Sequence, residues 1–123
     1  MLAGVCVGTN DLERAGAFYD EVLATVGFER QVTVPREIGY GRPGGPNEFW
    51  VLLPFDGKPA SVGNGVQVMF CTGDEEGVRA FYEAVIRLGG ADEGAPGPRE
   101  YSEGYYGAYC RDLDGNKLHV FRR

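Results

Sequence analysis

Two stretches of the chain carry apolar residues at three- and four-residue spacing, and this spacing predicts two amphipathic helices. The first is expected over residues 12–25 and the second over residues 75–88. Each follows a short polar turn, and glycines at Gly27 and Gly89-Gly90 are expected to end them. The predicted buried faces consist of Leu12, Ala15, Phe18, Tyr19, Val22 and Leu23 in the first helix and Val78, Phe81, Tyr82, Val85 and Ile86 in the second.

The other apolar runs are short and are separated by Gly and Pro, which predicts β-strands. The expected strands are residues 2–7, 28–34, 36–42, 49–53, 66–71, 105–111 and 117–121, with at most one irregular strand in the acidic, Pro-rich segment 91–104. The last two flank Asp112-Leu-Asp-Gly-Asn116, whose short polar side chains and Gly115 favour a tight turn. We therefore expect a terminal hairpin, with the only histidine, His119, in its second strand.

The order of strand, helix and three strands occurs twice, and the repeat is visible in the residues themselves. A shift of 63 places Val5, Thr9, Asp11, Glu13, Ala17, Phe18, Tyr19, Val22 and Gly27 on identical residues. A shift of 69 aligns Tyr40, Arg42, Asn47 and Val51 with Tyr109, Arg111, Asn116 and Val120. The repeat predicts an α+β domain of two tandem βαβββ modules, residues 1–57 and 63–123, joined by a linker over 58–62.

Two stretches of the chain carry a family resemblance. One is the start, Val5-Cys-Val-Gly-Thr-Asn-Asp-Leu-Glu-Arg-Ala15 followed by Ala17-Phe-Tyr19, and the other is the end, Arg111-Asp-Leu-Asp-Gly-Asn-Lys-Leu118. With the doubled module, they resemble the vicinal oxygen chelate superfamily, which includes glyoxalase I, bleomycin- and fosfomycin-resistance proteins and extradiol dioxygenases. The resemblance covers essentially the whole chain. It implies mixed sheets that curl into half-barrels and line a cleft, usually around a divalent metal.

The same resemblance places the four inward-facing ligand positions of the family at Gly4, Trp50, Gln67 and His119. Only His119 is a good metal ligand, because glycine and tryptophan offer none and a glutamine oxygen is a weak, neutral one. A different alignment would bring in Glu48 or Glu37, and Glu48 has no second acid nearby. We therefore expect no bound divalent metal and no other cofactor.

These positions suit instead a pocket for a small organic molecule. Trp50 offers a planar face, Gln67 offers a donor and an acceptor, and the imidazole of His119 titrates near neutral pH. Strand alternation adds apolar neighbours to the same face. The expected ligand-binding residues are Cys6, Trp50, Gln67, Met69, Tyr109 and Phe121. Any chemistry is expected at His119, although core packing explains Trp50 and His119 as well.

Further aromatic and charged residues flank this predicted pocket. Three tyrosines in a Gly-flanked loop are expected to cover the mouth of the cleft, unless they serve surface packing or a dimer contact: Tyr101, Tyr105 and Tyr106. Arg42 and Arg111, at repeat-related positions, are expected to pair with Asp112 or Glu48, and the alternative is that one of them meets a ligand carboxylate.

Composition narrows the classes of partner and compartment. The 123 residues carry a net charge of −6 without a basic cluster, which argues against nucleic acid and anionic membranes. The apolar runs are too short for a transmembrane helix, and the N-terminus does not resemble a signal peptide. Cys6, Cys71 and Cys110 form no CxxC pair and are expected to be reduced thiols, which favours the cytoplasm.

Two functions remain open at the level of sequence. The first is a glyoxalase/bleomycin-resistance-like protein that binds a small organic molecule without a metal. The alternative is a lyase or isomerase of the glyoxalase I type, with His119 as a base or metal ligand. A purely structural subunit would lack a cavity for a ligand. We also expect a homodimer, because each half-sheet has an apolar face to cover and edges to protect.

Overall fold

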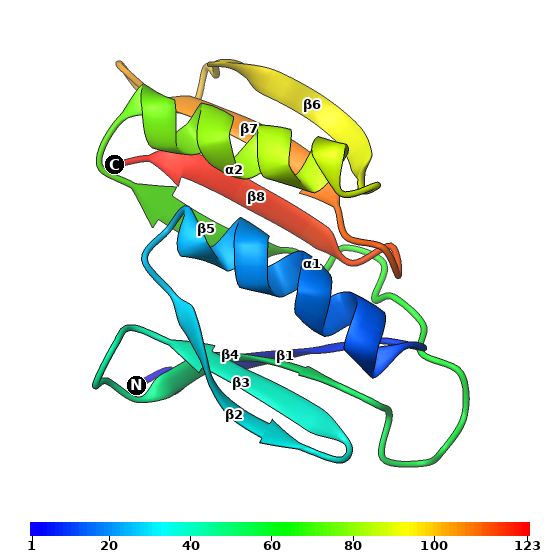
Figure 1. Cartoon of the computed structure of the whole chain (residues 1–123). Coiled ribbons are helices and arrows are strands. Elements are labelled where there is room, and N and C mark those ends of the chain that lie inside the picture. The colour runs from blue at the N-terminus through cyan, green and yellow to red at the C-terminus, as the bar shows by residue number, and fades with distance from the viewer.

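The computed structural model describes residues 1–123 and shows two βαβββ modules (Figure 1). The first contains β1 (Val5–Gly8), α1 (Leu12–Ala24), β2 (Glu29–Val34), β3 (Glu37–Gly41) and β4 (Asn47–Leu52). The second contains β5 (Val68–Thr72), α2 (Glu75–Arg87), β6 (Ala91–Pro98), β7 (Tyr106–Arg111) and β8 (Lys117–Arg122). The predicted α+β class and the tandem modules are confirmed. Neither helix is long and apolar enough to cross a membrane.

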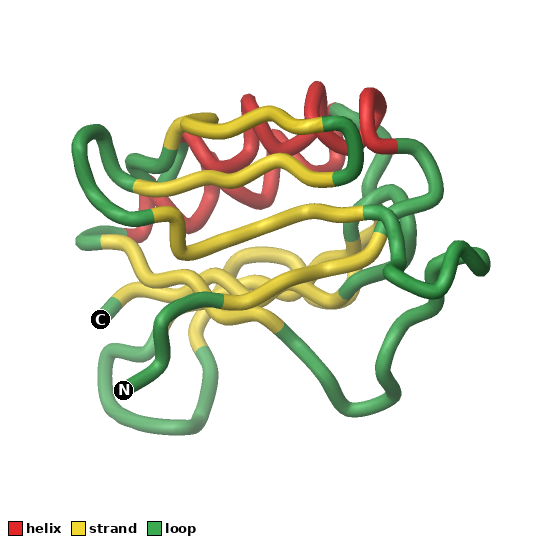
Figure 2. The backbone as a smooth tube through the Cα atoms, turned by 90° about the horizontal axis from the view of Figure 1, so that it is seen from below, coloured by secondary structure: helices red, strands yellow, loops and turns green.

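Each module forms its own four-stranded mixed sheet, and the two sheets do not close into a barrel (Figure 2). The strand orders are β1-β4-β3-β2 and β5-β8-β7-β6. In each sheet the first strand pairs in parallel with the last, and the other pairs are antiparallel. The repeat in the sequence is therefore also a repeat in topology.

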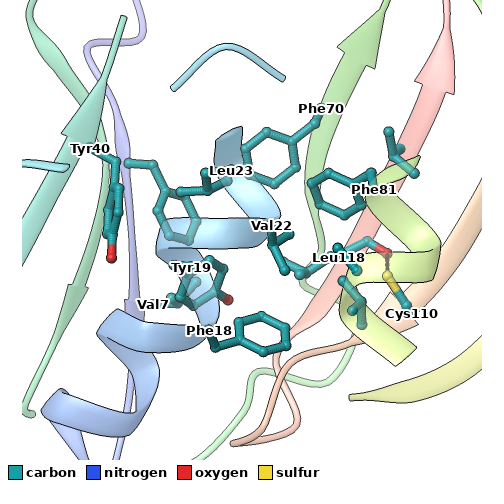
Figure 3. Close-up of a cluster of buried hydrophobic side chains, with 14 of the residues drawn as sticks. Val7, Phe18, Tyr19, Val22, Leu23, Tyr40, Phe70, Phe81, Cys110 and Leu118 are labelled. Carbon is teal, nitrogen blue, oxygen red and sulfur yellow. Dashed lines mark hydrogen bonds between the residues drawn. The ribbon is translucent and has the colours of Figure 1, made fainter. Parts of the chain in front are cut away.

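The helices of the two modules pack into one shared hydrophobic core. In Figure 1, α1 lies between the first sheet and the second module, and α2 covers one face of the second sheet. The ring of Phe49 in β4 lies 4.8 Å from that of Tyr19 in α1 and 5.7 Å from that of Phe70 in β5. Figure 3 shows side chains of both helices meeting in this core. Each sheet consequently has one helix-covered face and one helix-free face.

The residues that the repeat matches also cap the two helices in the same way. The hydroxyl of Thr72 donates to the backbone carbonyl of Asp74 at 2.8 Å, and Oγ1 of Thr9 accepts the backbone N–H of Asp11 at 3.1 Å. Each of these Asp side chains accepts a backbone N–H from the residue three places further on. This is the ordinary bond of an N-cap, so the repeated Thr-x-Asp pattern fixes where each helix begins.

Tyr40 and Tyr109, which the repeat aligns, do not occupy equivalent positions in the structure. Trp50 lies beside Cys6, and the equivalent His119 lies beside Met69. Tyr40, however, packs in the core, whereas Tyr109 pairs with His119 on the helix-free face. The β3–β4 pairing carries a register shift after Tyr40, and an offset of one residue turns a side chain to the other face of a strand.

The turn over residues 112–116, which we call the inter-module turn, is built around a buried carboxylate. Asp112 is 5% exposed, and its Oδ1 accepts the backbone N–H groups of Asp114 and Asn116, both at 2.9 Å. Its Oδ2 accepts the side-chain amide of Asn116 and the hydroxyl of Tyr19 in α1. The carboxylate thus links the terminal hairpin to a helix of the other module.

The inter-module turn also bonds the segment between β1 and α1. Asp114 accepts the hydroxyl of Thr9 at 2.6 Å and the backbone N–H of Asn10 at 3.0 Å. The amide of Asn116 donates to the carbonyl of Gly8 at 2.9 Å. These bonds join residues more than 100 positions apart, so this turn holds the end of the chain to its beginning.

The expected arginine pairs are wrong. Arg111 donates from Nε to Glu93 in β6, and Arg42 takes part in no ion pair. The oxygens of Asp112 instead accept four hydrogen bonds, three from Asp114 and Asn116 of its own turn and one from Tyr19.

We expect Tyr19→Phe to lower the free energy of unfolding by about 1–3 kcal/mol, because a buried carboxylate loses a donor. The matched control is Tyr82→Phe, since Tyr82 occupies the repeat-related position and donates to the exposed Asp92 at 2.9 Å. That change is expected to cost less than about 0.5 kcal/mol. Urea unfolding followed by circular dichroism measures both. Equal losses in the two variants would contradict a special role for the Asp112 contact.

Candidate functional site

The helix-free face of the second sheet carries four stacked rings, which we call the aromatic cluster: Tyr105, Tyr109, His119 and Phe121. The rings of Tyr109 and His119 lie 4.1 Å apart and within 10° of parallel, because the two residues are direct cross-strand partners. Phe121 follows His119 by two places on the same face, and Tyr105 stacks on Phe121 at 5.3 Å. His119 is only 1% exposed within this cluster.

Both ring nitrogens of His119 are engaged in hydrogen bonds. Nδ1 lies 2.9 Å from the carbonyl oxygen of Ala108, and Nε2 lies 2.6 Å from the hydroxyl of Tyr105. Since a carbonyl only accepts, Nδ1 carries the proton and donates it. In a neutral ring Nε2 is then the acceptor, and the Tyr105 hydroxyl is its donor. The lone pair that a metal or a substrate proton would use is therefore occupied by Tyr105.

Burial and neighbouring charges favour the neutral form of His119. Burial lowers its pKa, Arg99 and Lys117 lower it further, and the Ala108 carbonyl opposes them in part. Burial also raises the pKa of Tyr105, and that of Tyr109 to about 12. At neutral pH the site therefore presents an uncharged imidazole and protonated phenols.

On the helix-free face of the first sheet, Trp50 lies flat over a glycine. A Cβ atom at Gly39, its cross-strand partner, would come within 2.7 Å of the indole ring. Gly107 is the cross-strand partner of Phe121 rather than of His119, but a Cβ atom added there would lie 2.9 Å from Cε1 of His119. In both sheets a glycine in the third strand thus makes room for the large ring in the fourth.

The predicted site residues fall into three groups. Met69, Tyr109, His119 and Phe121 lie together on the helix-free face of the second sheet, and Cys6 and Trp50 lie on that of the first. Gln67 is exposed and immediately precedes β5. Trp50 and His119 lie on the faces of their sheets that point away from the shared core, and they belong to different sheets, so one chain does not bring them together.

An apolar hollow of about 370 Å³ lies where the two sheets approach each other. Phe28, Phe49 and Met69 contribute to its walls, and two of the four predicted metal positions, Gly4 and Gln67, lie on it. Glu48 supplies the one carboxylate of this hollow, and His119 does not reach it. Nowhere in the chain do three His, Cys, Asp or Glu side chains gather as they would around a metal ion. The donor set of a single chain therefore does not fit a divalent metal.

The three loop tyrosines do not act together. Tyr105 bonds His119, and the hydroxyl of Tyr101 lies 2.8 Å from that of Tyr109. Tyr106 instead turns to the helix-covered face, where Arg79 of α2 donates to its hydroxyl at 3.3 Å. The bond between Tyr105 and His119 was not predicted from the sequence. Alternate residues of a strand lie on the same face, so Tyr105 is expected on the face of Tyr109 and therefore near His119. This alternation is the signal in the sequence from which the bond could have been predicted.

Comparison with known proteins agrees with this architecture. The family model described as Glyoxalase/Bleomycin resistance protein/Dioxygenase superfamily matches residues 2–120. The structure of a glyoxalase/bleomycin resistance protein from Albidiferax ferrireducens T118 is 37% identical with a TM-score of 0.87, over 98% of this chain and 97% of that one. No curated protein matches the chain.

More distant structures share the fold. A glyoxalase-related enzyme from Fulvimarina pelagi is 20% identical with a TM-score of 0.78, over 100% of this chain and 88% of that one. A lactoylglutathione lyase from Agrobacterium tumefaciens is 20% identical with a TM-score of 0.69, over 99% of this chain and 92% of that one.

We expect His119 to titrate below the ordinary histidine value of about 6.5. As the only histidine, it gives a single set of imidazole signals for NMR. Tyr105→Phe is expected to raise its pKa, because the lost hydroxyl bonds the neutral form. Tyr101→Phe is the control, since that hydroxyl bonds Tyr109 instead. A midpoint at or above 6.5 in the unaltered protein would show that the ring is not buried as described.

The same shift predicts how stability depends on pH. A base with a depressed pKa in the folded state binds fewer protons there than in the unfolded chain. Its contribution is therefore complete above about pH 6.5 and is lost as the pH falls through the folded pKa. We expect His119→Gln to flatten this part of the stability profile between about pH 7 and 5, measured by urea unfolding. A profile of unchanged slope would contradict the assignment.

Proposed function

Because the chain belongs to the glyoxalase/bleomycin resistance protein/dioxygenase superfamily, we propose that it binds a small, partly aromatic molecule on its helix-free faces without a divalent metal. The observation that carries the proposal is the aromatic cluster around His119, whose two nitrogens already have partners. What the site offers a ligand is therefore ring faces and phenol hydroxyls rather than lone pairs for a metal. Such a mostly apolar surface with a few polar groups is typical of sites for small organic molecules.

We further propose that two copies of the chain form the complete site. The strands of the first sheet carry Glu29, Glu37 and Glu48 but only one basic residue, Arg30, which pairs with Asp20 of α1. The helix-free face of the second sheet instead carries Arg111 and Lys117, which share Glu93 as their one acidic partner. These opposite charges suit docking of the first sheet of one copy on the second sheet of another.

This arrangement would also cover apolar side chains that a single chain leaves in solvent. Met69, on the second sheet, is 55% exposed, and Val34, on the first, is 42% exposed. In the proposed dimer, Trp50 of one copy faces the aromatic cluster of the other. The ligand would then lie between an indole and a set of stacked rings, with polar contacts from phenols and an amide.

A second candidate is a lyase or isomerase in which His119 is the base. The observation that favours it is the tautomer: Nε2 is unprotonated and, with its lowered pKa, the ring is neutral at pH 7. A substrate would have to displace the Tyr105 hydroxyl before Nε2 accepted a proton. Turnover of a thiohemiacetal by the protein purified without chelator, lost in His119→Gln, would favour this candidate over binding alone.

We expect planar bicyclic aromatics to bind the unaltered protein, as measured by calorimetry and by the fluorescence of Trp50, the only tryptophan. Trp50→Leu and Tyr109→Leu should each weaken binding about three- to tenfold, the range of one aromatic contact. Phe55→Ala is the control, because Phe55 is fully exposed in the segment after β4.

The absence of a metal requirement is tested in the same samples. Nickel or zinc quenching of Trp50 at about a 1:1 ratio, abolished by His119→Ala, would overturn the claim. Aromatic binding that is unchanged in both leucine variants would remove the two rings from the site.

We expect the protein to sediment as a dimer at micromolar concentration. Glu37→Lys combined with Glu48→Lys should shift it toward monomer, because like charges would then face Arg111 and Lys117 across the interface. Glu13→Lys combined with Glu83→Lys is the control, since these residues are exposed on the two helices. A monomer in the unaltered protein, or equal effects of the two double variants, would count against the proposed interface.

A further inference from the structure

A polar hollow of about 430 Å³ adjoins the aromatic cluster. Arg111 and Lys117, which are cross-strand partners in β7 and β8, line it together with the amide side chains of Asn64 and Gln67. No Asp or Glu lines it. Lys117 connects the hollow to the cluster, because its Nζ lies 5.3 Å from the centroid of the Tyr109 ring. The hollow therefore joins cations and amide donors to a stacking surface.

The positive charge around the hollow is only partly neutralised. Glu93 is the one acid that pairs with these cations: it accepts from Arg111 and lies 3.8 Å from Lys117. A single carboxylate thus serves two cations, in a protein whose net charge is −6. This local excess of positive charge runs against the overall charge of the chain.

Arg99 adds a third cation that has no acidic partner. Its guanidinium carbon lies 5.7 Å from the centroid of Tyr109, and it takes part in none of the ion pairs. Its terminal nitrogens donate only to the backbone carbonyls of Gly94, Ala95, Gly97 and Pro98. These bonds fix the guanidinium in place without removing its charge. Burial lowers the pKa of His119, and Arg99 and Lys117 lower it further, so their field reaches the stacked rings.

We propose that the molecule bound by this protein is an aromatic carboxylate. Its ring stacks on the aromatic cluster, and its carboxylate lies in the hollow against Lys117 and Arg111, with the amides of Asn64 and Gln67 as further donors. The inference rests on the proposed function, and it adds the charge and the orientation of the ligand. Charge-assisted hydrogen bonds to a carboxylate are among the stronger polar contacts, so a matched neutral ligand should bind more weakly.

The test compares 2-naphthoate with 2-naphthamide, which has the same ring and a neutral head group. Calorimetry at pH 7.5 and low salt is expected to show naphthoate binding at least about tenfold more tightly to the full chain. This preference should shrink as the salt concentration rises, because the charges lie near the surface. In Lys117→Gln the preference is expected to fall to about threefold or less.

A second variant is expected to strengthen naphthoate binding, which a loss of folding could not do. Glu93→Gln removes the competing carboxylate and should tighten naphthoate about threefold, with naphthamide unchanged. Arg79→Gln is the matched control: Arg79 also lies over a tyrosine ring, at 5.9 Å from Tyr106, but on the helix-covered face. Circular dichroism establishes that each variant is folded.

The outcomes separate this inference from the proposed function. Equal binding of the two ligands leaves aromatic binding in place and overturns the anionic ligand. The same holds if the preference for naphthoate survives Lys117→Gln, or if Glu93→Gln leaves naphthoate affinity unchanged. Binding of neither ligand overturns the proposed function and, with it, this inference.

Discussion

The buried carboxylate of Asp112 is the contact on which the arrangement of the two modules depends. It accepts hydrogen bonds from its own turn and from Tyr19 of α1, so the β7–β8 hairpin and the first helix are fixed relative to each other. A buried carboxylate without donors would be costly, and its four hydrogen bonds therefore constrain the geometry strongly. With the hairpin held against α1, the helix-covered faces of the two sheets meet in one core, and the helix-free faces lie on the other side of each sheet.

This orientation explains why large rings lie on outward surfaces. Trp50 and the aromatic cluster are not needed to fill the shared core, which residues such as Phe18, Phe49 and Phe81 already occupy. Glycines leave room for the rings of Trp50 and His119 on these faces, so the backbone is shaped around them. Folding alone does not require these rings, because they lie outside the core. A bound ligand would account for the rings, and a second chain would account for the opposite charges of the two faces.

Most of the fold could be predicted from the sequence, because it depends on local periodicity and on a repeat. The Thr-x-Asp pattern and the helix periodicity correspond to real caps and real core faces. Two features could not be predicted. The core-facing position of Tyr40, which differs from that of Tyr109, depends on a register shift in the β3–β4 pairing, and the placement of the two modules depends on contacts of Asp112 and Asp114 across more than 90 residues. Neither leaves a periodic signal in the chain.

The bond between Tyr105 and His119 gives a physical account of a histidine that stands alone among the four metal positions predicted from the sequence. An imidazole that is 1% exposed cannot leave Nε2 without a partner at little cost, since an unsatisfied buried acceptor costs about 1–3 kcal/mol. A metal would normally meet that need, but Gly4, Trp50 and Gln67 cannot complete its shell. The phenol of Tyr105 supplies the missing partner and adds a ring to the stack. The same hydrogen bond that satisfies the nitrogen therefore also places His119 within a stack of aromatic rings.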